Sequence, residues 1–245
     1  MKSSSDIKVS LFASAIRTDC WLDFYNSLKQ SNRVPFEVVF VGPSRPDYKL
    51  PPHFKFIQSD FKPAQCTAIA ANNCQGEMLL QVVDDLEFSP GAIDLLFDEV
   101  NKAPDIMSTC HYYYGEEDCT TGQNALGRSH DQLPLLPVCG MFRQGLFRSA
   151  CGLDHRFFGV MWELDLYMRF YFEHKIKTQF VDAICKEKVD LNKGGDRLCS
   201  RSGQSDRNLF LQFWNLEDFV CGQSSLLSRK PFEPYSLLKL ELNEQ

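Results

Sequence analysis

The sequence contains no long apolar run and no recognisable leader. None of its segments approaches the roughly 18 to 20 consecutive apolar residues that a membrane-spanning helix needs. Residues 1–8, MKSSSDIK, show no apolar stretch behind a basic start, which a secretory signal would require. We therefore expect a soluble, cytoplasmic protein with no transmembrane segment.

An excess of basic residues is also missing. The chain carries 26 Lys and Arg against 32 Asp and Glu, a formal net charge of -6, and the two signs are interspersed. Proteins that bind nucleic acid or anionic membranes usually present a basic surface. The composition therefore argues against a nucleic-acid partner.

No CxxC pair occurs among the 10 cysteines, although zinc sites usually contain closely spaced ligand pairs. In a cytoplasmic protein, we expect these thiols to be reduced and mostly buried, where they pack as small apolar groups. A disulfide framework is the alternative.

Apolar residues are plentiful, at 44% of 245 residues, and their spacing alternates between strand and helix patterns. Strands are predicted over 9–15, 36–41, 55–57, 78–83, 106–114 and 178–184, with a further apolar segment over 135–142. Helices are predicted over 20–30, over 63–75 with Gly76 closing it, from Ser89 (N-cap) and Pro90 to residue 100, and over 163–173. This order predicts a single α/β domain whose sheet is mixed, mostly parallel and covered by helices on both faces.

Two acids, Asp84 and Asp85, follow the predicted strand over 78–83. Ligands of open α/β sheets bind outside the carboxyl ends of the strands, where this pair lies. Neighbouring side chains of a strand point to opposite sides, so one acid could hold a metal while the other meets another partner. Mg²⁺ and Mn²⁺ commonly use one or two carboxylates with substrate phosphates and water. The alternative is a solvated turn, in which Asp is common.

Four segments in this order resemble the inverting family 2 glycosyltransferases, which have the GT-A fold. The segments are VSLFASAIR, EVVFVGPS, CQGEMLLQVVDDLEFSPGAIDLL and CGLDHRFFGVMWELDLYMRFYFEHK, and the resemblance spans roughly residues 8 to 185. It implies a Rossmann-like GT-A domain over 1–207, with a donor-binding half over about 8–100 and an acceptor half over about 101–207. Residues 208–245 would form a C-terminal helical appendage.

The resemblance also implies roles for single residues. Asp85 matches the acid that holds Mn²⁺ or Mg²⁺ against the diphosphate of a nucleotide sugar, which we expect to be UDP-linked. Asp84 matches the acid that turns toward the ribose or the donor sugar. Ser14 and Arg17 lie in the loop that contacts the nucleobase in the family, and Lys62 lies where some members place a cation near the nucleotide.

The chain departs from the family pattern in three places. Gly42 stands where the family often has an Asp that contacts the base, so the identity of the nucleotide stays open at this position. The position of the catalytic base is often Asp, whereas this chain has Glu163. The late His of the family is missing from residues 183–189, AICKEKV, so a third protein ligand for the metal is not identified.

The role of Glu163 also has a physical basis. Transfer with inversion needs a carboxylate that takes the proton of the acceptor hydroxyl, and a cation that stabilises the departing diphosphate. In the first turn of a helix, the helix dipole favours the ionised form of Glu163. Asp165, Arg169 and Glu173 are spaced by four residues, and we interpret them as an ion-paired ladder.

Other candidates carry weaker signals. His130 and Asp131 could contact the acceptor, although exposed loop histidines are usually only solvated. The polar segment 186–207 is expected to be mobile, and its basic residues Lys193, Arg197 and Arg201 could close over a diphosphate. Phe210, Phe213, Trp214 and Phe219 are expected in the core or in a homodimer contact.

The sequence thus predicts a metal-dependent, inverting glycosyltransferase that moves a sugar from a nucleotide-diphospho-sugar to a glycan or other hydroxyl acceptor. One alternative is a GT-A-like module that binds a nucleotide or glycan without catalysis. Another is a nucleotidyltransferase, against which stands the loop ASAIRTDC, because it is not the Gly-rich, Lys- or Arg-bearing loop expected after the first strand.

Overall fold

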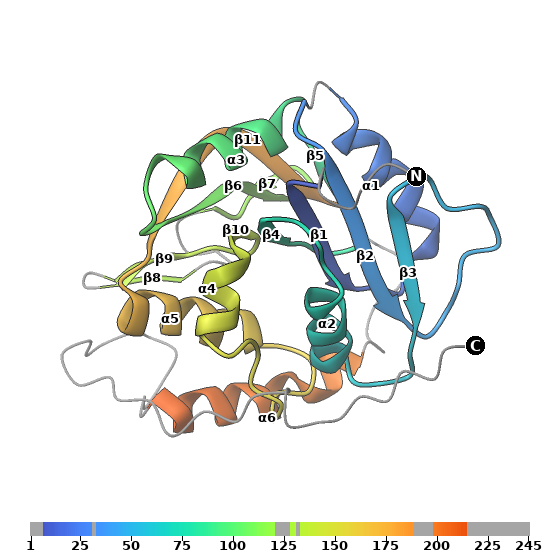
Figure 1. The fold of residues 1–245 in the computed structure, drawn as a ribbon. Coiled ribbons are helices and arrows are strands. Elements are labelled where there is room, and N and C mark those ends of the chain that lie inside the picture. Colours follow the sequence, from blue (N-terminus) through green and yellow to red (C-terminus); the bar gives the residue numbers. More distant parts are fainter. Residues whose placement is uncertain (1–6, 31–32, 121–127, 131–132, 189–197, 215–245) are drawn as a thin grey trace.

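The computed structural model describes residues 7–30, 33–120, 128–130, 133–188 and 198–214, which form one α/β domain around a curled sheet (Figure 1). The strand order in the main sheet is β3-β2-β1-β4-β10-β6-β11-β5, with β7 paired to β6. A separate two-stranded sheet contains β8 and β9. The strands are β1 (Val9–Ser14), β2 (Phe36–Gly42), β3 (Phe54–Gln58), β4 (Met78–Gln81), β5 (Leu86–Phe88), β6 (Ile106–Tyr114), β7 (Glu117–Asp118), β8 (Arg128–His130), β9 (Leu133–Leu136), β10 (Gly140–Arg143) and β11 (Lys177–Glu187).

The sheet is mixed, as the sequence predicts. Strands β3, β2, β1 and β4 run parallel to one another, and β6 and β11 are also parallel. Strand β10 is antiparallel to both of its neighbours, β4 and β6, and β5 is antiparallel to β11. The parallel half brings the carboxyl ends of β1 and β4 to the same edge, which positions the candidate site.

Helices cover both faces of the sheet (Figure 1). Side chains of α1 and α3 belong to one core cluster, and those of α2, α4, α5 and α6 belong to the other. The helices are α1 (Trp21–Leu28), α2 (Pro63–Asn72), α3 (Ala92–Lys102), α4 (Gln144–Ser149), α5 (Trp162–His174) and α6 (Leu198–Trp214), and a short 3₁₀ turn precedes α1 at Thr18–Cys20.

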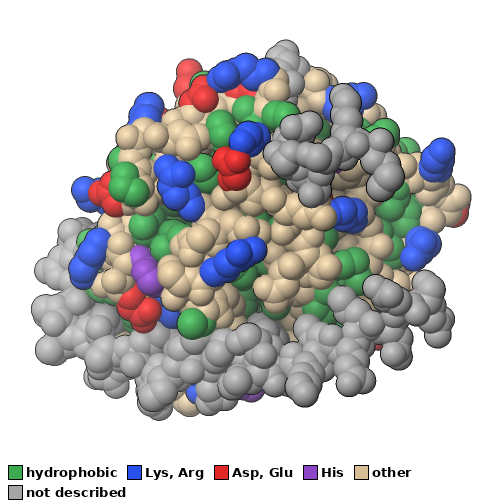
Figure 2. Space-filling model, in the orientation of Figure 1, with side chains coloured by type: hydrophobic (Ala, Val, Ile, Leu, Met, Phe, Trp, Pro, Cys, Tyr) green, Lys and Arg blue, Asp and Glu red, His purple; other side chains and the backbone are tan. Residues whose placement is uncertain are grey.

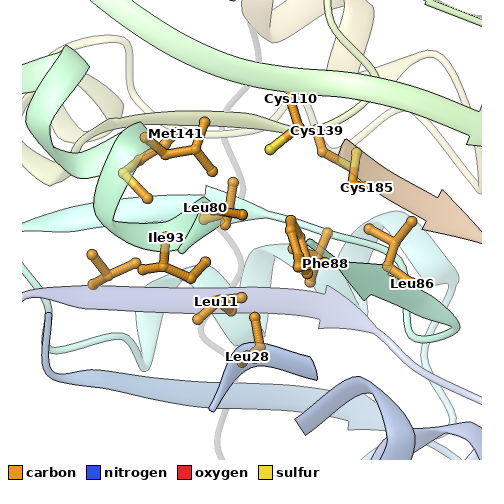
Figure 3. Packing of buried hydrophobic residues seen from close by; sticks show 14 of the residues in the cluster. Leu11, Leu28, Leu80, Leu86, Phe88, Ile93, Cys110, Cys139, Met141 and Cys185 are labelled. Atoms are coloured by element: carbon orange, nitrogen blue, oxygen red, sulfur yellow. The ribbon is translucent and has the colours of Figure 1, made fainter. Parts of the chain in front are cut away.

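The two cores follow from the alternation of side chains along each strand. In β1, Leu11 enters the core under α1 and α3, whereas its neighbour Phe12 enters the other core. Figure 3 shows the first core, in which Leu11 and Leu80 of the sheet lie near Leu28 of α1 and Ile93 of α3. Burial of this kind contributes about 25 cal/mol per Å² of apolar surface and holds the layers together.

The cysteines are free thiols at all eight positions for which the structure describes the side chain. Six of them are buried, which confirms the prediction for this part of the chain. Cys110, Cys139 and Cys185 lie close together in the first core (Figure 3).

Three local predictions were wrong at element ends. Helix α2 ends at Asn72 rather than at Gln75, and Gly76 packs against Ser10 instead of closing the helix. Gly91, with a φ of 78°, is the N-cap of α3 in place of Ser89. The Ser89 hydroxyl instead accepts a hydrogen bond from the backbone N–H of Ile184, because β11 passes beside it. Tertiary contacts outweighed the local capping preferences here.

The largest difference concerns the polar segment 186–207, which was expected to be mobile. Strand β11 continues to Glu187, and residues 198–207 belong to helix α6. Helix α6 runs through residues 207 and 208, and its Phe210, Phe213 and Trp214 are buried in the core. Lys193, Arg197, Asp131 and Phe219 lie outside the described residues, as do the side chains of His130 and Arg201.

The surface carries both signs of charge. Lys, Arg, Asp and Glu side chains are dispersed over the face seen in Figure 2 rather than gathered in one block. Within the described ranges, no helix has the length and apolar character needed to cross a membrane.

Candidate functional site

Asp84, in the turn after β4, is hydrogen-bonded to the loop after β1. Its buried carboxylate, in a residue 2% exposed, accepts hydrogen bonds from the backbone N–H groups of Ile16 and Arg17, both at 2.6 Å. The Arg17 guanidinium donates at 2.5 Å and the indole N–H of Trp21 at 3.3 Å. The described contacts of Asp84 are therefore with the protein's own loop and with the start of α1.

Arg17 joins the two acids. Its Nη1 lies 2.5 Å from Oδ1 of Asp84, and its Nε lies 3.0 Å from Oδ2 of Asp85. The expectation that the two carboxylates point to opposite sides was wrong, because β4 ends at Gln81 and both acids lie in the following turn, where strand alternation no longer applies. The acid pair is a buried, ion-paired centre, not a solvated turn.

A third carboxylate acts on the same guanidinium. Burial alone would lower the pKa of Arg17, but Asp84, Asp85 and Glu187 together raise it above its ordinary value. Glu187 ends β11 and pairs in register with Leu86, directly after Asp85, and its carboxylate accepts a hydrogen bond from the Tyr112 hydroxyl. Three carboxylates therefore act together on the Arg17 guanidinium.

Ser14 and Gly42 end the neighbouring strands β1 and β2. Ser14 is half-buried and pairs in register with Val41. At Gly42, an added Cβ would lie 1.8 Å from the carbonyl oxygen of Ala15. The chain therefore has no room at position 42 for the Asp that the family often has there, and any contact of Gly42 with a nucleotide would come from its backbone.

Substitution of Gly42 by Ala should destabilise the fold by at least about 3 kcal/mol, because β1 and β2 would have to separate to admit the methyl group. Chemical denaturation followed by circular dichroism measures this loss. Gly145→Ala is the matched control, since nothing lies within 4 Å of an added Cβ there. Equal stability of the two variants would contradict the close approach of β1 and β2.

Lys62 lies apart from the acid pair in the described contacts. It precedes α2 with an exposed side chain, and its Nζ lies 5.0 Å from the centroid of the Phe158 ring. The backbone N–H of Ala64 donates to the carbonyl oxygen of Phe158 at 3.0 Å. Lys62 is thus tied to the turn before α5 rather than to the loop after β1.

Glu163 is the second residue of α5, in the first turn of the helix as predicted. Its Oε2 is buried and, among the described residues, has no hydrogen-bond partner. Burial raises the pKa of Glu163 to about 7, and the Asp206 carboxylate also raises it. Near neutral pH the carboxyl therefore exchanges a proton readily, which is the property that a general base needs.

A hydrogen-bonded chain links the helix of Glu163 to the strand before the acid pair. Tyr167, one turn after Glu163, donates from its hydroxyl to Oε1 of Gln81 at 3.0 Å. The same hydroxyl accepts a hydrogen bond from the backbone N–H of Gly140 at 3.1 Å. Gln81 is the last residue of β4, so α5 is anchored beside the strand whose end carries Asp84 and Asp85.

Asp165 and Arg169 form an ion pair, Oδ2 to Nε at 3.0 Å, but inside the protein rather than on its surface. Both residues are at most 1% exposed, whereas Glu173 is exposed. Arg169 also donates to the carbonyl oxygens of Ala150 and Gly152. The role of Asp165 in this geometry is to hold α5 in the core.

Several residues at the site carry no local sequence signal. Gln81, Glu187 and Tyr167 stand in ordinary strand and helix patterns. Strand pairing brings Glu187 beside the acid pair, and the packing of α5 on the sheet brings Tyr167 to Gln81. Asp206 lies in a segment whose polar composition suggested mobility. Glu187 lies within residues 183–189, which the sequence analysis searched only for a His.

No protein-family model matches the chain, and no curated protein matches it either. Solved structures do match. The crystal structure of S. aureus TarS 1-349 in complex with UDP has a TM-score of 0.58 at 13% identity, over 87% of this chain and 68% of that one. The crystal structure of S. aureus TarS has a TM-score of 0.59 at 15% identity, over 87% of this chain and 41% of that one.

The structure of GalNAc-T7 with UDP, GalNAc and Mn²⁺ has a TM-score of 0.60 at 13% identity, over 84% of this chain and 48% of that one. This chain thus spans less than half of the GalNAc-T7 and longer TarS chains. Together with the mixed sheet and its two layers of helices, these similarities show that the chain is a single domain with the GT-A fold of glycosyltransferases.

Proposed function

We propose that this protein is an inverting, metal-dependent glycosyltransferase that moves a sugar from a nucleotide-diphospho-sugar, expected to be UDP-linked, to a hydroxyl acceptor. The observation that carries the proposal is the Glu163 carboxyl, with a buried, unpartnered oxygen and a pKa raised to about 7. The fold supports the donor class, since UDP is bound in the TarS and GalNAc-T7 structures. Family 2 membership is part of the proposal.

In this mechanism, Glu163 takes the proton of the acceptor hydroxyl as its oxygen attacks the anomeric carbon, and the nucleoside diphosphate leaves. Asp84 holds the loop after β1, with Ser14 and Arg17, in position for the nucleotide. Arg17 keeps its positive charge, because the surrounding carboxylates raise its pKa. Lys62 would bind nearer to α5, beside Phe158.

The carboxylates of this site suit a hard divalent ion, for which Asp85 is the proposed ligand and Glu187 a second oxygen donor. Among the described residues, no group of three or more His, Cys, Asp and Glu is placed to hold an ion. An ion at Asp85 would therefore complete its coordination with water and donor phosphate oxygens. When bound, it would neutralise the charge of the departing diphosphate.

We therefore expect Mn²⁺ to bind weakly to the protein alone and about tenfold or more tightly when UDP is present, because the nucleotide completes the ligand set. Electron paramagnetic resonance of free Mn²⁺, titrated with and without UDP, measures this coupling. Asp85→Asn should abolish the increase. Asp94→Asn, a change on α3 at a carboxylate that binds the backbone N–H groups of Arg33 and Val34, should leave it intact. Tight Mn²⁺ binding without UDP, or an unchanged increase in Asp85→Asn, would contradict the proposed ligand.

A binding module without catalysis is the second candidate, because Oε2 of Glu163 is buried. The two proposals differ in the fate of the donor. An enzyme should slowly hydrolyse one nucleotide sugar in the presence of Mn²⁺, whereas a binding module should hold the nucleotide without turnover. Liquid chromatography of a panel of nucleotide sugars after incubation separates these outcomes.

A further inference from the structure

Asp206 of α6 binds the turn that leads into α5. Its carboxylate, in a residue 2% exposed, accepts hydrogen bonds from three consecutive backbone N–H groups. These come from Phe158 at 3.0 Å, Gly159 at 2.7 Å and Val160 at 2.9 Å. Three charge-assisted hydrogen bonds to one carboxylate fix the path of the backbone just before Glu163.

This turn lies between two parts of the proposed site. On one side, Phe158 contacts the start of α2, through the Ala64 N–H and the Lys62 ammonium. On the other side, Met161 adopts a φ of 68° and Glu163 follows two residues later. A left-handed conformation is costly for a residue with a side chain, so the surroundings must hold it in place. Asp206 supplies such a restraint directly before Met161.

Helix α6 is itself anchored to the same region. The Trp214 indole N–H donates to Oδ1 of Asp165 at 2.9 Å, and the Arg156 guanidinium lies 3.9 Å from the centroid of the Phe213 ring. Asp206 therefore lies on a helix whose position is fixed by these contacts. Its contacts distinguish it from an acid that only solubilises a surface helix.

We propose that Asp206 is a positioning residue that holds the 158–160 turn, and through it the Glu163 carboxyl, in the arrangement used for glycosyl transfer. The inference rests on the proposed function, because it assigns Asp206 a role through Glu163. Asp206 touches neither donor nor acceptor in this scheme.

The electrostatics add an effect that a purely structural contact would not have. The negative charge of Asp206 is one cause of the raised pKa of Glu163, after burial. The Glu163 carboxylate in turn contributes to the raised pKa of Tyr167, which lies on the same helix. Other charged or titratable groups on the described elements packed around the turn include Lys62, which lies over Phe158, and the ion pairs Asp154–Arg156 and Asp165–Arg169. They also include His155 and, on α6 itself, Arg207.

The test compares Asp206→Asn, which keeps an acceptor oxygen but removes the charge, with Asp206→Glu, which keeps the charge but displaces the carboxylate. In Asp206→Asn, the acid limb of the pH profile of donor hydrolysis should move to lower pH by about half a unit, and kcat should fall about tenfold with little change in KM. Asp206→Glu should lower kcat while leaving the acid limb in place.

Asp94→Asn is the matched control, because Asp94 also accepts backbone N–H bonds, from Arg33 and Val34, but from α3 on the opposite face. It should lower stability without moving the acid limb. A carbon-13 NMR titration of the Glu163 carboxyl, assigned with Glu163→Gln, measures the same pKa without substrate. Suppose that Asp206→Asn lowers the pKa of Glu163 but the wild-type protein shows no turnover. The proposed function would then be wrong, while the electrostatic coupling of Asp206 and Glu163 would stand.

An unchanged Glu163 titration in a folded Asp206→Asn, with kcat equal to that of the wild type, would overturn the inference. Failure of both Asp206 variants to fold would also overturn it, since the residue would then serve the fold alone.

Discussion

Replacement of Glu163 by Gln should lower the rate of donor hydrolysis by about 10² to 10⁴-fold while donor binding is retained, because the amide cannot accept the proton. The wild-type rate should rise with pH through about 7, where the carboxyl ionises. Steady-state kinetics across pH 5 to pH 9 in the presence of Mn²⁺ and binding of UDP by calorimetry measure the two effects. A variant with wild-type turnover would exclude Glu163 as the base.

The same substitution should stabilise the fold at high pH. The pKa of Glu163 is raised from 4.5 in an unfolded chain to about 7 in the folded protein. The buried carboxyl is therefore tolerated while it is protonated, and its stabilising contribution is lost as the pH rises through 7. Gln stays neutral throughout. Urea denaturation should show equal stability of the two proteins near pH 4.5 and a gain of about 3 kcal/mol for Glu163→Gln at pH 8.5.

A matched control is available on the same helix. Glu173 is exposed, so Glu173→Gln should change neither turnover nor the pH dependence of stability. The combination of lost turnover and gained stability marks a group that is kept for chemistry rather than for the fold. Loss of stability in Glu163→Gln at high pH would instead indicate a structural role for the residue.

Replacement of Arg169 by Met should destabilise the protein by about 3 to 5 kcal/mol, because the substitution leaves the Asp165 carboxylate buried without its cation. It also removes the donors to the carbonyl oxygens of Ala150 and Gly152. Arg169→Lys should recover only part of the loss, since one ammonium cannot reproduce the planar fork that reaches three partners. Chemical denaturation at pH 7 measures both variants.

An exposed ion pair provides the comparison. Lys102 lies 2.6 Å from Glu99 on α3, but its side chain is 65% exposed. Lys102→Met should therefore change stability by no more than about 0.5 kcal/mol. If Lys102→Met and Arg169→Met lowered the free energy of unfolding by similar amounts, the buried Asp165–Arg169 ion pair would matter no more to stability than an exposed one.

Local sequence patterns predicted the main elements well, because strands and helices of this fold have regular apolar spacing. The segments VSLFAS and FEVVFVG form β1 and β2, and the helical spacing around Glu163 corresponds to α5. The polar composition of 198–207 misled the prediction, because helix α6 depends on its packing against α5 and the preceding turn rather than on its own apolar content.

Regular apolar spacing and the acid pair after a buried strand were enough to place this chain in a mixed α/β class and to point to the edge where β1 and β4 end. The tertiary structure decided which groups meet at that edge, namely Arg17 between both acids and Glu187 beside them. It also placed Asp206 against the turn before Glu163. These contacts join residues far apart in the chain, so they depend on strand order and helix packing, which spacing along a sequence does not encode.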